Sequence, residues 1–507
     1  MDSLAICLPF LSLILLVVFA RRPLWLAAFL AFILATILWP MGASVNWENL
    51  FAPILRALLV AFDISLILLG AISFLEFLQS AGRTERIKAA LIHMTAGNQV
   101  ILVLLTAWLF CGFIEGAAGF GTPAAIVAPL LLSLGFHPIT AAILPLIGNT
   151  TAVPFGAVGT PIRVGFAGVL VPGISSLATG INLIAALVPV FAIVWLCRRL
   201  APEGRPDTVQ TKDRIILAVQ ASFCFTIPAF LLSFFGFEFP SLFGALIGIL
   251  FFLLITHRRR SMANASAQSK SLVTSASYLE LIKSFFPYLL LCMGLLLGKV
   301  FLGDQRITWI LADQSFSIAI FQPGLVFILI MVGLKLFSDD SRQISLAASL
   351  RKAAHRLPPV SFAIFCMASL AQYMMAFLDI SQWLAEPAEA QLHFWQYLCI
   401  AIAPFLGAIG SFISGSATVS NLLFAGLLAE LSQILKLPLT LLLALQLLGA
   451  GIGNMIALQN LVAVQATVGL KNAERDMLSK LYLPCLAYAV LTSFLGVIVF
   501  GIWQWLS

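Results

Sequence analysis

Three ionisable side chains stand inside or beside long apolar stretches of this sequence. Glu115 falls between FCGFI and GAAGFG, Asp63 lies within LLVAFDISLILLG, and Arg163 directly follows GAVGTPI. A charge near the middle of a membrane costs about 2.5–3.5 kcal/mol on insertion scales, so a residue of this kind is a functional candidate. Because burial favours the protonated form of a carboxyl group, Glu115 is the first candidate for carrying a coupling proton, and Asp63 is the second.

Each of these residues also has a simpler structural interpretation. Glu115 could cap a broken helix, and Asp63 could make an interhelical hydrogen bond. Arg163 could pair with Glu115, anchor a span at the membrane interface, or receive a substrate carboxylate through its planar guanidinium group. The sequence leaves these alternatives open.

Two clusters of small polar residues mark a second kind of candidate site. They lie in apolar regions, 117–161 and 416–470, that Gly, Pro, Asn and Thr interrupt. Irregular backbone at membrane depth survives only where it lines a protein-enclosed or wet cavity, and its free N–H groups can bind an anion there. Tight helix packing alone is the competing interpretation. The candidate ligands are Asn149, Thr150, Thr151, Ser416, Thr418, Ser420 and Asn421.

The composition places all these residues in a membrane protein. Of 507 residues, 61% are hydrophobic and 10% are charged, and the mean hydropathy is +1.06. A soluble chain carries about 25% charged residues. Soluble enzymes, nucleic-acid binders and secreted disulfide scaffolds are therefore excluded.

The hydropathy pattern predicts an all-α polytopic fold with about twelve transmembrane helices plus two Gly/Pro-broken or re-entrant hairpin regions. Each predicted span is long enough to cross about 30 Å of hydrocarbon. The predicted spans are 4–20, 24–41, 57–78, 99–114, 178–197, 215–234, 238–256, 285–302, 322–337, 360–378, 394–413 and 481–503.

The net charge of +7 is explained by topology. Of the 28 Lys and Arg residues, 23 fall in six loops that lie on one face if the spans alternate and each broken region returns to its own side. By the positive-inside rule this face is cytoplasmic. The chain is therefore expected to be a multi-pass membrane protein.

The two interrupted regions resemble each other. Thr122 and Thr418 are 296 residues apart, and Gly148 and Gly449 are 301 apart. The span before the first copy starts at a basic loop, whereas the span before the second follows an acidic segment. Inverted repeats with broken segments at matching positions are typical of secondary transporters. We predict a first membrane repeat at 1–214, with broken motif 113–162, and a second at 215–507, with broken motif 404–470.

The sequence predicts no cofactor or metal site, since the five His are scattered and no Cys pair has ligand spacing. Motifs of intramembrane enzymes are absent as well, so the chain is not expected to be an enzyme. The expected partners are a small organic anion, a proton and membrane lipid, but no nucleic acid. A homo-oligomer is left open.

Three blocks of this sequence resemble the lactate permease family of bacterial transporters for lactate, glycolate and similar 2-hydroxy monocarboxylates. They are FIEGAAGFGTPAAI (113–126), LGFHPITAAILPLIGNTTAVPFGAVGTPI (134–162) and PFLGAIGSFISGSATVSNLLFAGL (404–427), with a fainter stretch at 449–470. The resemblance implies proton-coupled uptake of a small organic monocarboxylate across the bacterial cytoplasmic (inner) membrane, and the two inverted repeats predict that it occurs by alternating access. It adds Gly119 and Gly121 to the substrate-binding candidates, and the repeat adds Thr122.

Two positions depart from the family pattern. Ala417 stands where the family often has Asp, and Asn454 stands where it often has Lys. An acid and a base are lost together, which leaves no uncompensated buried charge. Asn454 and Arg163 join the predicted substrate site. A passive or differently coupled carrier or channel for another organic anion is the alternative function.

Overall fold

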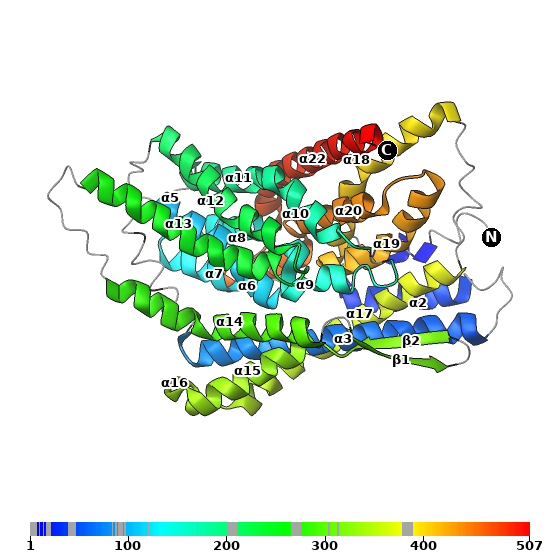
Figure 1. Ribbon diagram of the computed structural model, residues 1–507, viewed down its shortest axis with the longest axis horizontal. Helices are drawn as coiled ribbons and strands as arrows, with labels where there is room; N and C mark the ends of the chain where they lie inside the picture. Colours follow the sequence, from blue (N-terminus) through cyan, green and yellow to red (C-terminus); the bar gives the residue numbers. More distant parts are fainter. Residues whose placement is uncertain are drawn as a thin grey trace.

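The computed structural model describes most of the chain, and nearly all of the described part is helical. The described residues are 22–38, 47–83, 98–119, 122–169, 171–199, 210–264, 275–302, 305–311, 314–377 and 389–506, with a few positions between 8 and 16 and between 85 and 95. Figure 1 shows most of the long helices lying roughly along the longest axis of the molecule.

The helices of the first half are α2 (Leu24–Leu38), α3 (Trp47–Ser80), α5 (Gln99–Val103), η3 (Leu104–Phe110), α6 (Cys111–Ala118), α7 (Thr122–Ser133), α8 (Pro138–Asn149), η4 (Val153–Phe155), α9 (Gly156–Arg163), α10 (Ile174–Ala185), α11 (Leu187–Arg199), α12 (Thr211–Leu232) and α13 (Pro240–Asn264). Those of the second half are α14 (Ser275–Leu302), α15 (Pro323–Phe337), α16 (Asp339–Arg342), α17 (Leu346–Phe377), α18 (Glu389–Ser414), α19 (Ala417–Ile434), α20 (Leu439–Asn454), α21 (Leu458–Thr467) and α22 (Glu474–Leu506).

The membrane class predicted from the sequence is confirmed. Within the described residues nine helices are long and apolar enough to cross a membrane, or ten if one bent helix pair counts as a span. Three further apolar helices are shorter, in α2, α14 and α15. More than half of the predicted span 4–20 lies outside the described residues, so the exact number of twelve stays a prediction.

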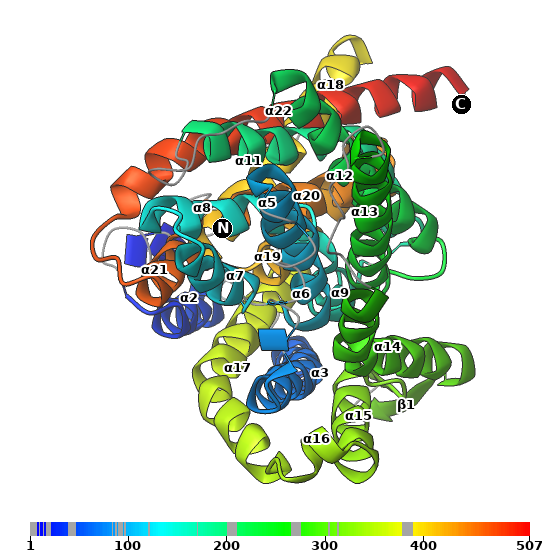
Figure 2. The same ribbon diagram turned by 90° about the vertical axis from the view of Figure 1, so that its left-hand side faces the viewer.

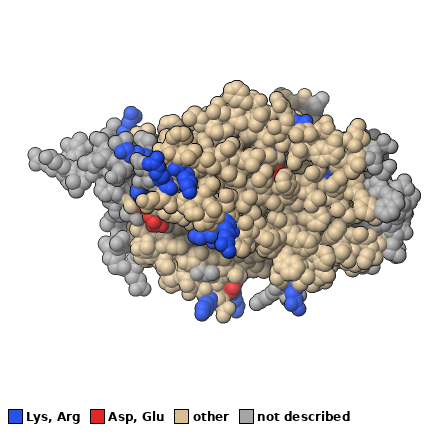
Figure 3. Space-filling view, turned by 90° about the horizontal axis from the view of Figure 1, so that it is seen from below, with Lys and Arg blue, Asp and Glu red and all other residues tan. Residues whose placement is uncertain are grey.

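The two ends of the molecule differ in charge. The end where α11 and α13 finish and α12 and α14 begin lies at the left of Figure 1. In the view from below, most Lys and Arg side chains gather toward this same end (Figure 3). The positive-inside rule predicts that this end is the cytoplasmic one.

A two-stranded antiparallel hairpin interrupts the otherwise helical fold. Strands β1 (Arg306–Leu311) and β2 (Gln314–Ala319) pair between α14 and α15. The sequence predicted only helices in this region. The segment RITWIL is rich in β-branched and aromatic residues, which favour a strand. The fold is therefore all-α with one added hairpin.

The helix that precedes the first broken region lies in the centre of the protein. It runs from Gln99 to Ala118 as α5, η3 and α6, and its most apolar window is entirely buried. The middle section, η3, is π-helical, a distortion that occurs frequently at functional sites. Trp108 fixes this section by donating from Nε1 to the carbonyl oxygen of Ala221, at 3.1 Å. Glu115 lies one turn beyond the π-helical section.

The first broken region is bent where the sequence predicted an interruption. Helix α8 ends at Asn149, and η4 and α9 continue at an angle of 59° to it. The second region is less interrupted, because Ala417–Ile434 and Leu439–Gln465 are each long enough to span. Seen along the long axis, α6, α7, α9 and α19 lie in the middle of the molecule, between α3 and α17 on one side and α11 and α22 on the other (Figure 2).

Packing between the two halves is reciprocal. Helix α2 packs on α17 while α15 packs on α3, α9 packs on α19 while α21 packs on α7, and α10 packs on α20 while α22 packs on α8. At the centre of the α3–α17 pair, Ser65 Oγ lies 2.7 Å from Ser361 Oγ, and these residues are 296 positions apart. This separation equals the offset between Thr122 and Thr418.

The boundary predicted at residue 214 separates helices that pack together. Helices α12 and α13 pack on each other, and both contact η3; α12 also contacts α10 and α11, and α13 contacts α6. Both helices follow the predicted boundary almost entirely, but they pack against helices that precede it. The division at residue 214 stays a prediction.

Candidate functional site

A cavity lies where the two broken regions meet. The regions approach closely there: a side chain at Gly451 would lie within 2.8 Å of the carbonyl oxygen of Thr150. About 340 Å³ of empty space, which includes adjoining open solvent, lies between its walls. Its lining residues are Glu115, Gly119, Val153, Gly156, Ala157, Thr160, Pro161, Gly415, Ser416, Ala417, Thr418 and Asn454.

Glu115 supplies the acidic group of this cavity. Its side chain is buried, and its Oε2 accepts a hydrogen bond of 2.9 Å from Asn149 Nδ2. Gly156 packs directly on the carboxylate, because a Cβ at Gly156 would come within 2.2 Å of Glu115 Oε1. The carboxyl group is thus held between the end of α8 and the start of α9.

The backbone beside Glu115 takes an unusual conformation. Ala157, Val158 and Gly159 have φ angles of 42°, 57° and 74°. A β-branched residue such as Val158 is a genuine outlier at positive φ. Backbone outliers of this kind cost about 1–3 kcal/mol each and cluster at ligand-binding and switch regions. This left-handed turn brings Ala157 and Thr160 into the wall of the cavity.

The opposite wall is the beginning of α19. Ser416 caps this helix, and its hydroxyl accepts from the backbone N–H of Val419 at 3.4 Å. The backbone N–H groups of Ala417 and Thr418 belong to the first turn, where no intrahelical acceptor exists. Partial positive charge and free N–H groups make a helix N-terminus an anion-binding element. The cavity therefore has an acidic wall and an anion-attracting wall.

Several predicted ligands stand behind the cavity and not in its lining. Ser420 donates to the carbonyl oxygen of Gly407, and Asn421 donates to that of Pro161. Thr150 donates to the carbonyl oxygens of its own helix. Thr151 forms a hydrogen bond with the Tyr488 hydroxyl. These side chains support the lining residues and join the two halves.

Two other predicted ligands cannot be placed. Gly121 lies outside the described residues. Thr122 begins α7, and its backbone alone is described. The structure brings Glu115, Gly119, Ser416, Thr418 and Asn454 together around the cavity.

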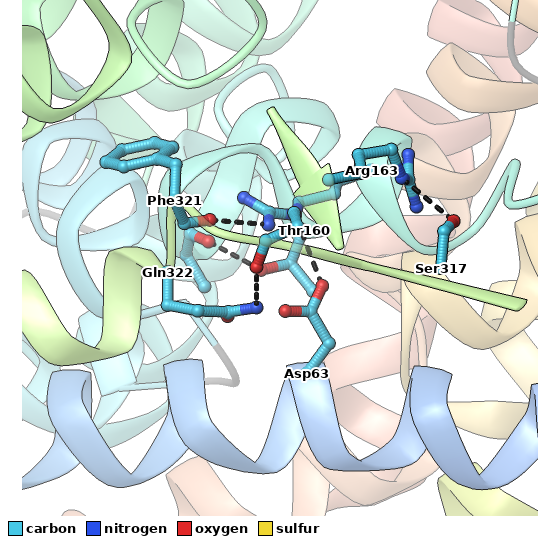
Figure 4. A network of polar contacts seen from close by, with 9 residues as sticks. Asp63, Thr160, Arg163, Ser317, Phe321 and Gln322 are labelled. Carbon is cyan, nitrogen blue, oxygen red and sulfur yellow. Dashed lines mark hydrogen bonds and ion pairs between the residues drawn. The ribbon is translucent and has the colours of Figure 1, made fainter. Parts of the chain in front are cut away.

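Arg163 and Asp63 form an ion pair beside the cavity, and neither lines it. Arg163 Nε lies 3.2 Å from Asp63 Oδ2, and its Nη2 donates to the carbonyl oxygen of Phe321 at 2.9 Å. Figure 4 shows Asp63 rising from α3 toward Arg163, with Phe321 on the other side. The sequence allowed an ion pair between Arg163 and Glu115. In the structure Arg163 pairs with Asp63 instead.

We expect Arg163→Ala to reduce stability without changing substrate affinity. Asp63 would keep a largely buried charge without its partner, and breaking a fully buried pair costs about 3–5 kcal/mol, less for a pair that water partly reaches. Unfolding temperature and the apparent KM for a carboxylate measure the two effects. Arg163→Ala/Asp63→Ala should recover much of the stability, and Arg306→Ala, which removes an exposed Arg bonded to Ser317, is the control. A large rise in KM in the folded single variant would assign Arg163 to the substrate.

Sequence reasoning missed part of the lining. Val153, Gly156, Ala157, Thr160, Pro161, Gly415 and Ala417 were not selected, although all lie in or beside the motif blocks. One signal was available: Gly119 and Gly415 are 296 residues apart, the same offset as that between Thr122 and Thr418. Their alignment would have brought Gly415 into the site together with Gly119. Within the described residues no group of His, Cys, Asp and Glu is placed to hold a metal ion.

Comparison with known proteins gives matches along most of the chain. A family model described as L-lactate permease matches residues 2–302 and 308–502. A relative from Haemophilus influenzae is 29% identical over 470 residues, covering 84% of this chain and 85% of its own. The L-lactate permease of Escherichia coli K12 is 28% identical, covering 82% of this chain and 80% of its own, and the glycolate permease GlcA of the same organism is 25% identical with the same coverage.

Proposed function

We propose, from the premise that this chain belongs to the L-lactate permease family, that it imports small organic monocarboxylates such as L-lactate or glycolate. The family match extends over most of the chain, and relatives of both names are similar to it over more than four fifths of its length. It is a multi-pass protein of the bacterial inner membrane and a transporter, not an enzyme. The observation that carries the proposal is the cavity between the two broken regions, with Glu115 on one wall and the N-terminus of α19 on the other.

The proposed mechanism is alternating access by two inverted repeats. The reciprocal packing and the Ser65–Ser361 contact support a pseudo-twofold relation between about 22–199 and 323–506, with α12 to α14 inserted between them. Figure 1 shows α5 beginning near the left end of the molecule and α18 beginning at the right. In transporters of this design the substrate site lies at the repeat interface, where the cavity is found here.

The proposed coupling ion is a proton carried by Glu115. A buried carboxyl group that lines the cavity can exchange a proton with water when the cavity is open. When the cavity is closed, its ionised form is costly, so the group is expected to keep the proton. Asp63 is a weaker candidate, because its carboxylate is paired with Arg163. The proposed substrate ligands are Gly119, Ser416, Thr418 and Asn454, supported from behind by Asn149, Ser420 and Asn421.

Uptake of radiolabelled L-lactate and glycolate into proteoliposomes tests the proposal. We expect accumulation that follows an inward proton gradient, and counterflow when the vesicles contain unlabelled substrate. Accumulation indifferent to the gradient would contradict proton coupling. Conductance above carrier turnover, without counterflow, would favour the passive channel. Empty liposomes treated with the same gradient are the control for diffusion of the protonated acids.

A further inference from the structure

Asn460, which is absent from the cavity lining, holds the side chain of Asn454, which is part of it. Asn454 ends α20 and Asn460 lies in α21, on the other side of the break. The Nδ2 atom of Asn460 donates to the main-chain carbonyl oxygen of Asn454 at 3.0 Å and to Asn454 Oδ1 at 2.5 Å. One amide group thus fixes both the backbone and the side chain of Asn454.

These two hydrogen bonds determine which way both amides face. A main-chain carbonyl oxygen can only accept, so the Asn460 atom that contacts it must be the nitrogen. That nitrogen can only donate, so the Asn454 atom that meets it must be the oxygen. Exchanging O and N in either side chain would place two donors or two acceptors against each other. The amide atom that Asn454 has left for a ligand is Nδ2, which has no protein partner among the described residues.

A second unpartnered donor lines the same cavity. Thr418 is 4% exposed, and its hydroxyl makes no hydrogen bond with the described residues. It lies in the first turn of α19, whose backbone N–H groups also lack intrahelical partners. Among the lining residues no Lys, Arg or His is present. An anion in this cavity is therefore met by neutral donors and a helix terminus.

We propose that Asn460 is a positioning residue that keeps Asn454 as a hydrogen-bond donor, and that Asn454, Thr418 and the first turn of α19 form the carboxylate subsite of the transporter. The inference rests on the proposed function and deepens it. A subsite made of donors takes a carboxylate and rejects an amine or ammonium group, which needs acceptors. Glu115, on the other wall, is left for the proton.

The test compares two replacements of Asn460. Asn460→Asp replaces the donor by an acceptor, so the Asn454 amide turns and its oxygen takes the place of the donor. Loss of a hydrogen bond to a charged group corresponds to about a tenfold to hundredfold rise in KM. Asn460→Leu removes the donor without adding charge, and it should also raise KM, but by a smaller factor than Asn460→Asp. Counterflow of L-lactate and glycolate at equal pH on both sides gives KM and kcat without proton driving.

Rescue distinguishes positioning from a structural role. In the Asn460→Asp background, Asn454→Lys supplies a group that can only donate, so KM should return toward the wild-type value. Asn472→Asp, an equal charge change at an exposed position, should leave KM unchanged. We expect kcat and unfolding temperature of the Asn460 variants to stay near wild type.

Three results would overturn the inference. One is an unchanged KM in active Asn460 variants. Another is a rise in KM with Asp but none with Leu, because charge alone would then explain the effect. The third is a fall in kcat and stability at constant KM, which would make Asn460 purely structural. A wild-type protein that exchanges no carboxylate would instead refute the proposed function itself.

Discussion

Replacing Glu115 by Gln is expected to abolish accumulation of substrate while leaving exchange intact. Gln has the shape of the protonated acid and can still accept the hydrogen bond from Asn149 Nδ2 through its side-chain oxygen. The variant can therefore close around substrate, but it cannot release a proton on one side and bind it on the other. Counterflow should continue at a rate near that of the wild type, and the proton gradient should no longer drive uptake.

The size of this effect follows from the driving force. For one proton carried with one monocarboxylate, a pH difference of one unit supplies about 1.4 kcal/mol and sustains about tenfold accumulation. The Glu115→Gln variant should equilibrate at a ratio of one. Because a proton and a monocarboxylate carried together are neutral, a potential imposed across the vesicle should not change the accumulation ratio of the wild type.

A matched control separates coupling from general damage. Glu76 is a carboxyl group on α3 that is not among the cavity-lining residues and pairs with Lys352 and Arg356. Glu76→Gln should keep the accumulation ratio of the wild type. If Glu115→Gln still accumulates substrate tenfold, another group carries the coupling proton. If the variant loses both counterflow and accumulation, Glu115 is needed for binding or folding.

Replacing Gly148 or Gly449 by Ala is expected to prevent correct folding. These glycines occupy matching positions in the proposed repeats, and each lies against a carbonyl oxygen of the span that precedes its broken region. An added Cβ would stand 1.6 Å from Ala107 O at Gly148 and 1.9 Å from Pro404 O at Gly449. Both contacts are backbone to backbone, so relief requires moving a helix, and we expect a cost of at least about 1–3 kcal/mol at each site.

Gly333 provides the control, because replacing it by Ala is expected to change stability in the opposite direction. It lies in α15, and an added Cβ would meet nothing within 4 Å. Ala in a helix interior is favoured over Gly by about 0.5–1 kcal/mol, so Gly333→Ala should be neutral or stabilising. Size-exclusion profiles and unfolding temperatures in detergent measure all three variants. Normal profiles and unfolding temperatures for Gly148→Ala and Gly449→Ala would show that the close helix contacts are not required.

Features that depend on composition and spacing could be predicted from the sequence. Apolar run length located the helices from 24–41 onward, because a long membrane helix is specified by hydropathy alone. The sequence matched Gly148 with Gly449, and the structure shows a close backbone contact with the preceding span at each of them. Glu115 was found because an acid among apolar residues has few structural uses.

Other features depend on contacts between distant residues. The sequence allowed Arg163 to reach Glu115, but the direction of α9 after its left-handed turn brings it to Asp63, 100 positions away. That turn places Ala157 and Val158 at positive φ, a conformation their residue types disfavour. The β1–β2 hairpin was hidden by the apolar spans around it. The role of Asn460 could not be seen until Asn454 lay beside it.

The contact between Ser65 and Ser361 has a consequence for the transport cycle. Two equivalent points of a twofold arrangement can touch each other only on the rotation axis itself. If the repeats exchange conformations as proposed, each contact away from the axis is replaced by the equivalent contact of the other repeat. The Ser65–Ser361 contact is its own equivalent, so it is the same in both states. The paired hydroxyls on α3 and α17 then mark the pivot point of the conformational change, and they stay in contact in both the inward-facing and the outward-facing state.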